Sequence, residues 1–155
     1  MKGMPVYIIW AALAGQGQVI IMIKLITGKK GSGKTKVLVD LIKDAAKSTQ
    51  GNIVCIEKSM QLTYDIPHSV RLVDVDCYNI DSYDKFYGFL MGTLAANYDI
   101  SEIFVDGILK MCGRNYEDLA NLFGAIEKVT NDVEIVFTVS EDKENLPESV
   151  TKYIK

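Results

Sequence analysis

A glycine-rich segment near the start of the chain combines residue types that bind phosphate groups. The segment reads Gly-Lys-Lys-Gly-Ser-Gly-Lys-Thr. Glycine allows backbone conformations that other residues avoid, so successive main-chain N–H groups can point toward one anion. The lysine that follows the last glycine adds a positive charge for the β- and γ-phosphates, and the threonine adds a hydroxyl that can ligate Mg²⁺. The spacing predicts a nucleoside triphosphate site made of Gly28, Lys29, Lys30, Gly31, Ser32, Gly33, Lys34 and Thr35.

The stretches on either side of this segment have the patterns of a strand and a helix. Residues Val19–Thr27 are rich in isoleucine and predict a buried strand, whereas Gly33–Lys47 carries apolar residues at helical spacing. A helix that begins here would present the positive end of its dipole to the phosphates. The buried stripe predicted for this helix consists of Val37, Leu38, Leu41, Ile42 and Ala45.

A second candidate element is an acidic residue that ends a hydrophobic strand. Asp106 follows Ile-Phe-Val in a strand expected over Glu102–Asp106. Together with the glycine-rich segment, this pattern resembles the Walker A and Walker B motifs of the P-loop NTPase superfamily. The resemblance implies that Asp106 holds Mg²⁺ through a water molecule, opposite Thr35. Asp74 and Asp76, at the end of the strand predicted over Arg71–Asp76, are the alternatives.

The chain departs from the superfamily pattern at the residue that activates water. Many P-loop ATPases have a glutamate directly after the Walker B aspartate, but Gly107 follows Asp106 here. Glu57, at the end of the strand predicted over Asn52–Lys58, is the best substitute at the same sheet edge, and a solvated strand-end charge is the alternative. The predicted catalytic residues are therefore Lys34, Asp106 and Glu57, and we expect slow hydrolysis.

The stretch from Met22 to Lys155 also resembles small single-domain bacterial P-loop proteins of unknown role, some of which are labelled twitching-motility ATPases. This resemblance rests on Met-Ile-Lys-Leu-Ile-Thr followed by the glycine-rich segment, and on Ile-Phe-Val-Asp. It implies an ATP-binding protein with slow hydrolysis or a nucleotide-switch role, and ATP and Mg²⁺ as cofactors. The motility label has no support, since retraction motors carry several histidines and this chain has only His68.

Two other functions fit the same segment. One is a small-molecule kinase with a nucleoside-like acceptor, but a transferring phosphoryl group needs cationic stabilisation and the only arginines are Arg71 and Arg114. The other is a non-catalytic module in which nucleotide orders an interaction surface. Arg114 is either an arginine finger or an exposed helix-end residue. Thr138 and Ser140 either sense the γ-phosphate or are ordinary strand-end hydroxyls.

Strands and helices alternate along the rest of the chain. Ser82 or Asp81 is expected to cap one helix and Asn115 another, a fifth strand is expected over Val133–Val139, and Pro147 should open a short last helix. This order predicts an α/β fold, a three-layer P-loop NTPase sandwich with a mostly parallel five-stranded sheet and helices on both faces. Ligands of such sheets bind at the carboxyl edge of the strands.

Composition limits the partners of the protein. The 155 residues are 48% hydrophobic, which fits one globular domain, and the chain is acidic and poor in arginine, with a formal net charge of -3. Nucleotide is therefore an expected partner and nucleic acid is not, while a homo-oligomer stays open. Cys55, Cys77 and Cys112 lie far apart and lack zinc-site spacing, so we expect reduced thiols and a cytoplasmic location.

The first 21 residues differ from the rest in composition. No charged residue occurs between Lys2 and Lys24, but Gly15–Gln18 interrupts the apolar run. Polar amides are costly in lipid, so no stable membrane insertion is expected. We expect translation to start at Met22, which makes residues 1–21 a misassigned extension. A poorly ordered or packed extension, a signal peptide and an anchor are the alternatives, and residues 22–155 are expected to form the nucleotide-binding domain.

Overall fold

Five parallel strands form the middle layer of the protein. The computed structural model describes residues 22–129 and 132–154. The strand order is β1-β5-β4-β2-β3, and every neighbouring pair is parallel. All carboxyl ends therefore lie at one edge, as the sequence predicts. The strands are β1 (Met22–Thr27), β2 (Asn52–Glu57), β3 (Arg71–Asp74), β4 (Ile100–Val105) and β5 (Glu134–Val139).

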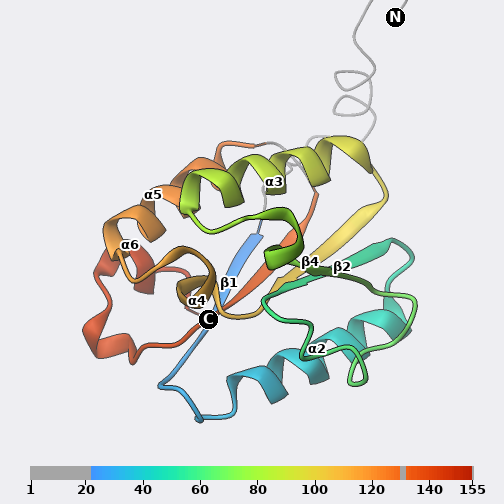
Figure 1. Cartoon of the computed structure of the whole chain (residues 1–155), viewed down its shortest axis with the longest axis horizontal. Helices are drawn as coiled ribbons and strands as arrows, with labels where there is room; N and C mark the ends of the chain where they lie inside the picture. The colour runs from blue at the N-terminus through green and yellow to red at the C-terminus, as the bar shows by residue number, and fades with distance from the viewer. Residues whose placement is uncertain (1–21, 130–131, 155) are drawn as a thin grey trace, which may run out of the picture.

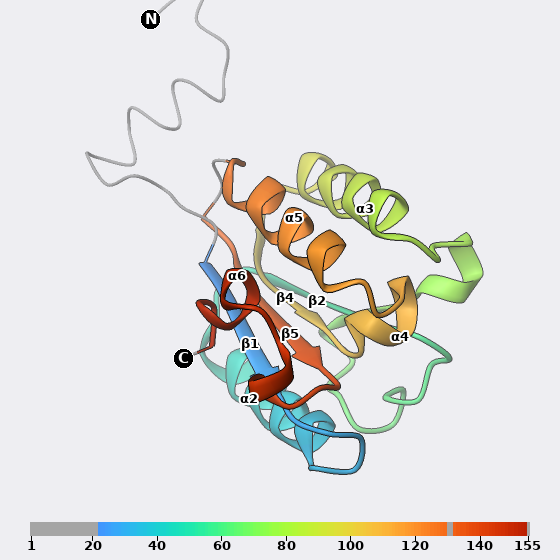
Figure 2. The same ribbon diagram turned by 90° about the vertical axis from the view of Figure 1, so that its left-hand side faces the viewer.

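Helices cover both faces of this sheet, which confirms the predicted three layers (Figure 1). Helix α2 lies against one face, and α3 and α5 lie side by side against the other (Figure 2). The helices are α2 (Lys34–Ser48), α3 (Tyr83–Ala96), α4 (Ile108–Cys112), α5 (Tyr116–Glu127) and α6 (Glu148–Thr151). In the described parts of the chain, none of these helices has the length and apolar character needed to cross a membrane. Residues 1–21, and with them the expectations for this segment, lie outside the described residues.

The ends of the helices and strands follow local hydrogen bonding. Ser82 caps α3 by accepting the N–H of Lys85, and Asn115 caps α5 by accepting the N–H of Asp118. Strand β3 ends two residues earlier than predicted. The reason is that the Asp74 carboxylate accepts the N–H of Asp76 at 3.0 Å, which starts a short 3-10 helix.

The buried stripe of α2 differs from the predicted one. Leu38, Ile42 and Ala45 are buried as expected, but Val37 and Leu41 are exposed (48% and 41%). The buried side also includes Val39, which shares a hydrophobic cluster with Leu62, Ile66 and Val70 from the loop after β2. Adjacent helical residues are about 100° apart, so a helix that buries Val39 turns the opposite side, with Val37 and Leu41, toward solvent.

Strand β1 lies at the border of the sheet. On its outer side, Ile154 makes a single parallel bridge with Leu25, and the Leu25 N–H donates to the Tyr153 carbonyl at 3.2 Å. Tyr153 is buried and packs edge-on against Phe123, with ring centroids 5.1 Å apart. Residues from the last described turn of the chain therefore cover part of β1.

Two glutamates oppose each other near the amino ends of β4 and β5. Glu102 pairs with Glu134 in the sheet register, and Glu134 accepts a 2.9 Å hydrogen bond from Lys24. One carboxylate oxygen of Glu102 is buried without a hydrogen-bond partner among the described residues. Burial raises the pKa of Glu102, the Glu134 charge raises it further, and Lys24 opposes both. The ionised form of Glu102 therefore lowers the stability of the fold.

Replacing Glu102 with glutamine should raise the free energy of unfolding by about 1 kcal/mol near neutral pH, because a buried and incompletely bonded charge is removed. The folded state binds this proton more tightly than the unfolded state, so wild-type stability falls as pH rises through the raised pKa. The advantage of glutamine should vanish below the ordinary pKa of 4.5, where both states are protonated. Urea denaturation of both proteins near neutral pH and below pH 4.5 measures the difference in free energy of unfolding. An equal gain from Glu144→Gln, at an exposed position, would contradict the explanation.

Candidate functional site

The loop between β1 and α2 has the backbone conformation of an anion-binding cradle. Gly28, Gly31 and Gly33 have φ values of 149°, 84° and 91°, which are unfavourable for other residues. A Cβ atom at Gly28 would also lie 2.5 Å from the Ser32 hydroxyl. Gly33 precedes α2 and makes no side-chain cap, so the N–H groups of the first helical turn stay available for an anion.

The Lys34 ammonium group lies inside this loop. Lys34 is 8% exposed, and its Nζ donates to the Lys29 carbonyl at 2.8 Å and to the Ser32 hydroxyl at 3.4 Å. Burial lowers the pKa of Lys34, while the charges of Asp106 and Asp142 raise it. The cation is therefore held where the glycine-rich backbone curves, and its present partners are neutral oxygen atoms.

Asp106 and Thr35 meet at the carboxyl edge of the sheet, 71 residues apart in sequence. The Thr35 hydroxyl lies 3.3 Å from both carboxylate oxygens of Asp106. The Thr138 hydroxyl donates to Asp106 at 2.8 Å and accepts the N–H of Gly107 at 2.7 Å. Thr138, at the end of β5, is 1% exposed and fixes the carboxylate of its neighbour.

These two groups fit Mg²⁺ by their chemistry. A hydroxyl and a carboxylate are oxygen ligands, and Mg²⁺ usually keeps water and phosphate oxygens as its other ligands. Over residues 22–129 and 132–154, no three His, Cys, Asp or Glu side chains come together as an all-protein metal site.

Glu57 is buried, which contradicts the interpretation as a solvated strand-end charge. It is 1% exposed, and both of its carboxylate oxygens accept the N–H of Leu62, at 3.0 and 3.2 Å. Ile56 of β2 pairs with Val105 of β4. Glu57 and Asp106 directly follow this pair, so they lie at the carboxyl ends of two neighbouring strands. Burial raises the pKa of Glu57, the Leu62 hydrogen bond lowers it, and the Asp106 charge raises it.

The alternative aspartates have other partners. Asp74 accepts the N–H groups of Ser59 and Asp76, at 3.1 and 3.0 Å. Asp76 lies 4.0 Å from the Lys58 ammonium group. No hydrogen bond in the described part of the chain joins either carboxylate to the glycine-rich loop. The structure brings Asp106, and neither alternative, into contact with Thr35.

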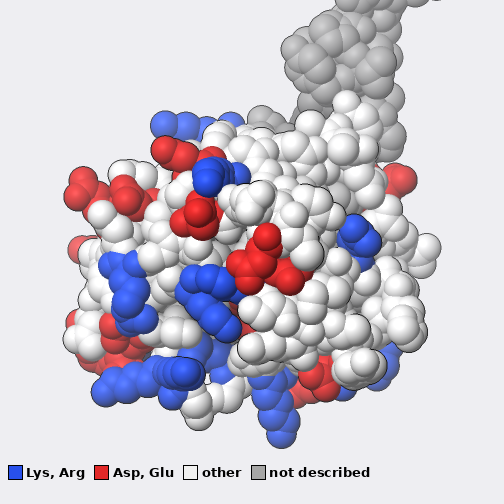
Figure 3. Space-filling view, in the orientation of Figure 1, with Lys and Arg blue, Asp and Glu red and all other residues white. Residues whose placement is uncertain are grey.

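The segment after β5 supports the start of the loop, which sequence reasoning missed. The Gly28 N–H donates to the Glu141 carbonyl at 3.0 Å, and Lys29 forms a 3.3 Å ion pair with Asp142. The signal was available, because residues after a parallel strand must lie at the same edge as those after β1. Figure 3 shows that Lys and Arg side chains gather toward the lower left, where Figure 1 places this loop.

Arg114 is engaged by this same segment. Its guanidinium donates to the Glu141 carboxylate at 2.9 Å and to the Ser140 carbonyl at 3.1 Å. The Tyr116 hydroxyl also donates to Glu141, at 2.7 Å, and these and other hydrogen bonds lower the pKa of Glu141 to about 2. Arg114 is thus an exposed residue just before α5 that forms an ion pair with Glu141.

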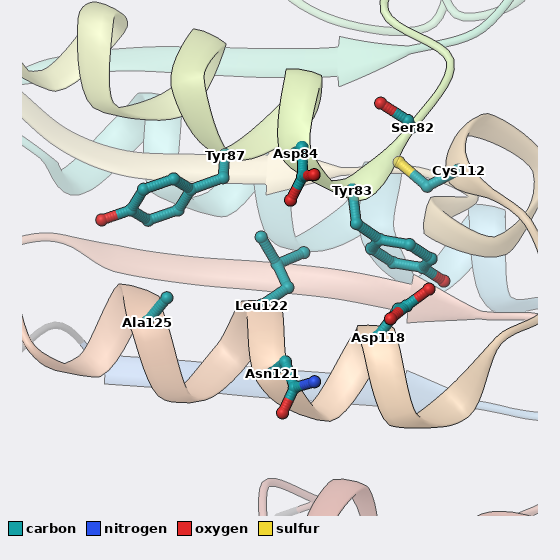
Figure 4. A pocket seen from close by; sticks show the side chains of 9 residues that line it. All are labelled: Ser82, Tyr83, Asp84, Tyr87, Cys112, Asp118, Asn121, Leu122 and Ala125. Carbon is teal, nitrogen blue, oxygen red and sulfur yellow. The ribbon is translucent and has the colours of Figure 1, made fainter.

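A separate cavity of about 420 Å³ lies between α3 and α5 (Figure 4). Tyr83 and Asp118 point toward each other across it, and Cys112 contributes from α4. The Tyr83 hydroxyl donates to the Gly113 carbonyl at 2.6 Å. None of the residues that line this cavity belongs to the glycine-rich loop or to the sheet edge beside it, so the cavity is distinct from the candidate site.

The chain matches no protein-family model and no curated protein. Among solved structures it is similar to the flagellar accessory protein FlaH from Methanocaldococcus jannaschii, with a TM-score of 0.55. The two sequences are 18% identical, and the likeness covers 89% of this chain and 68% of the FlaH chain. At this identity the likeness concerns the fold alone. The protein therefore has an all-parallel α/β fold similar to that of FlaH.

Proposed function

We propose that the protein binds ATP with Mg²⁺ at Gly28–Thr35 and hydrolyses it slowly. The observation that carries this proposal is the joint geometry of the loop and the sheet edge. Three glycines at positive φ surround a buried ammonium group, and the next hydroxyl contacts a strand-end carboxylate. Such an arrangement matches a triphosphate with its metal ion. Adenine is preferred because the sequence lacks the Asn-Lys-x-Asp motif that reads guanine.

The residues of the loop have separate tasks in this proposal. Main-chain N–H groups bind the phosphate oxygens, and Lys34 exchanges its carbonyl and hydroxyl partners for the β- and γ-phosphates. Thr35 would ligate Mg²⁺ directly, and Asp106, oriented by Thr138, would hold the ion through water. When bound, Mg²⁺ would supply charge neutralisation to the phosphates. Residues 22–155 then act as one nucleotide-binding domain.

Glu57 is the proposed general base. As the oxygen of a water molecule bonds to the γ-phosphorus, Glu57 takes a proton from that water. The bond between the γ-phosphorus and the bridging oxygen breaks, which leaves ADP and inorganic phosphate. The proton then passes to solvent. We expect this reaction to be slow because Glu57 is buried and already accepts the Leu62 N–H.

The same hydrogen bond favours a second candidate function, a non-catalytic module in which nucleotide orders an interaction surface. Isothermal titration with ATP, ADP and GTP, each with and without Mg²⁺, tests nucleotide binding. Phosphate release with and without added nucleosides then separates the functions. Phosphate release with ATP alone supports the ATPase. ADP formation that needs an acceptor, without matching phosphate release, supports a kinase, because the γ-phosphoryl group stays on the acceptor. Binding without phosphate release or ADP formation supports the module. No binding would refute the proposal.

Replacing Asp106 with asparagine should increase the Mg²⁺ concentration needed for half-maximal ATP binding by about 10-fold or more, because a ligand-orienting carboxylate is lost. ADP binding without Mg²⁺ should change little. Titration of ATP affinity against Mg²⁺ measures the effect. Asp76→Asn, which changes an exposed carboxylate away from Thr35, is the matched control. Equal losses of ATP and metal-free ADP affinity in Asp106→Asn would argue against a metal role.

The environment of the protein also belongs to the proposal. In the described residues all three cysteines are free, Cys55 is buried and Cys77 is exposed. Free thiols and an ATP requirement are typical of the cytoplasm, which we propose as the location. The acidic composition argues against nucleic acid as a partner.

A further inference from the structure

The loop that follows β2 closes over Glu57. Leu62 and Ile66 are 3% and 8% exposed and belong to the hydrophobic cluster beneath α2. This burial fixes the Leu62 N–H against both oxygens of the Glu57 carboxylate. A general base must come within hydrogen-bond reach of the water that it deprotonates, directly or through one further water. At 1% exposure, Glu57 has no such access in this arrangement.

The first residues of the loop are in strained conformations. Ser59 and Met60 have φ values of 75° and 48°, in the left-handed region that residues other than glycine rarely adopt. Two hydrogen bonds on the surface hold them there. The Ser59 N–H donates to Asp74 at 3.1 Å, and the Thr63 hydroxyl donates to the Met60 carbonyl at 2.9 Å. Opening this loop would release the strain and break these surface hydrogen bonds, and it would also move Leu62 and Ile66 out of the hydrophobic cluster beneath α2.

We propose that residues 58–66 form a latch that withholds the catalytic base. With the latch closed, Leu62 holds Glu57 away from solvent, and with the latch open, Glu57 is free to reach the attacking water. This inference rests on the proposed ATPase function. Within the described residues, no hydrogen bond joins the latch to Gly28–Thr35. The latch therefore governs the rate of hydrolysis and leaves nucleotide affinity unchanged.

The first test loosens the latch at its surface. Thr63→Val removes the hydroxyl bond to Met60 at an exposed position and keeps the shape of the side chain. Thr93→Val, which removes a 2.8 Å bond from the Thr93 hydroxyl to the Phe89 carbonyl on α3, is the matched control. Loss of one hydrogen bond should raise the population of the open latch, and with it kcat, up to about fivefold. KM for ATP and ADP affinity should stay the same.

The second test tightens the latch. Asparagine tolerates the left-handed conformation better than methionine does, so Met60→Asn should stabilise the closed latch and lower kcat by about twofold to fivefold. Met60 is 42% exposed, so little packing is lost. In a Glu57→Gln background, Thr63→Val and Met60→Asn should both leave the residual rate unchanged, because the group that the latch withholds is gone.

Hydrogen exchange at the Leu62 amide follows the latch directly. Thr63→Val should speed this exchange, Met60→Asn should slow it, and Thr93→Val should leave it alone. Faster exchange without faster hydrolysis, or no change in exchange in either latch variant, would overturn the latch while ATP binding and basal hydrolysis could still hold. Wild-type protein without ATP binding would instead refute the proposed function, so the two failures are distinguishable.

Discussion

Replacing Lys34 with alanine should lower the affinity for ATP by about 10- to 100-fold. Hydrogen bonds from a charged donor to phosphate are worth about 1.5–3 kcal/mol, and here the ammonium group is already desolvated within the loop. Isothermal titration measures the loss, and thermal unfolding checks that the fold is intact.

Lys36→Ala is the matched control for this variant. Lys36 is an exposed lysine in the same helical turn, so the control removes the same charge near the same helix end. General electrostatic attraction alone would give similar losses in both variants, because both remove one positive charge from the first turn of α2. We expect Lys36→Ala to change the affinity by less than about threefold. ATP binding that persists in Lys34→Ala would mean that the site is assigned to the wrong part of the chain.

Replacing Glu57 with glutamine should lower kcat for ATP hydrolysis by about 100-fold or more and leave nucleotide binding intact. General bases contribute about 10²–10⁴-fold, and glutamine cannot accept the proton of water. Its carbonyl oxygen can still accept the Leu62 N–H, so the loop should keep its position. Steady-state phosphate release measures kcat, and titration with ATP measures binding.

Glu102→Gln is the control for this second variant. Glu102 is another strand glutamate whose pKa is raised by burial, and it lies toward the opposite end of the sheet. The same chemical change there should alter stability and leave hydrolysis as in the wild type. If Glu57→Gln hydrolyses ATP at the wild-type rate, water is activated by another group and the latch inference also fails.

The layers of this fold could be predicted from the sequence because apolar residues repeat with a helical spacing in the main helices and form short apolar runs in the strands. The aspartate that contacts Thr35 was also predictable, since a charge after three apolar strand residues must emerge at the sheet edge. Helix α4 was missed. It has five residues between Gly107 and Gly113, which is too short for a helical period to appear.

The surroundings of Glu57 could not be predicted, because they depend on where a loop folds back. Nothing in the spacing of Leu62 indicates that its N–H meets a carboxylate five residues earlier. The exposed side of α2 could not be predicted for the same reason. The loop after β2 completes the hydrophobic cluster that buries Val39, and this burial sets which side of α2 faces solvent. Short loops that pack into a core change which residues are buried without changing the pattern of the neighbouring helix.

The bridge between Ile154 and Leu25 covers part of the outer side of β1, which is a border strand of the sheet. The unpaired backbone groups of an edge strand can form hydrogen bonds with strands of other molecules. The turn that contains the buried Tyr153 occupies these groups along part of β1, so intermolecular pairing is prevented there. Strand β1 ends at Thr27, directly before Gly28. We therefore expect that loss of the contact between β1 and the last described turn would expose part of β1 and disturb the loop that begins at Gly28.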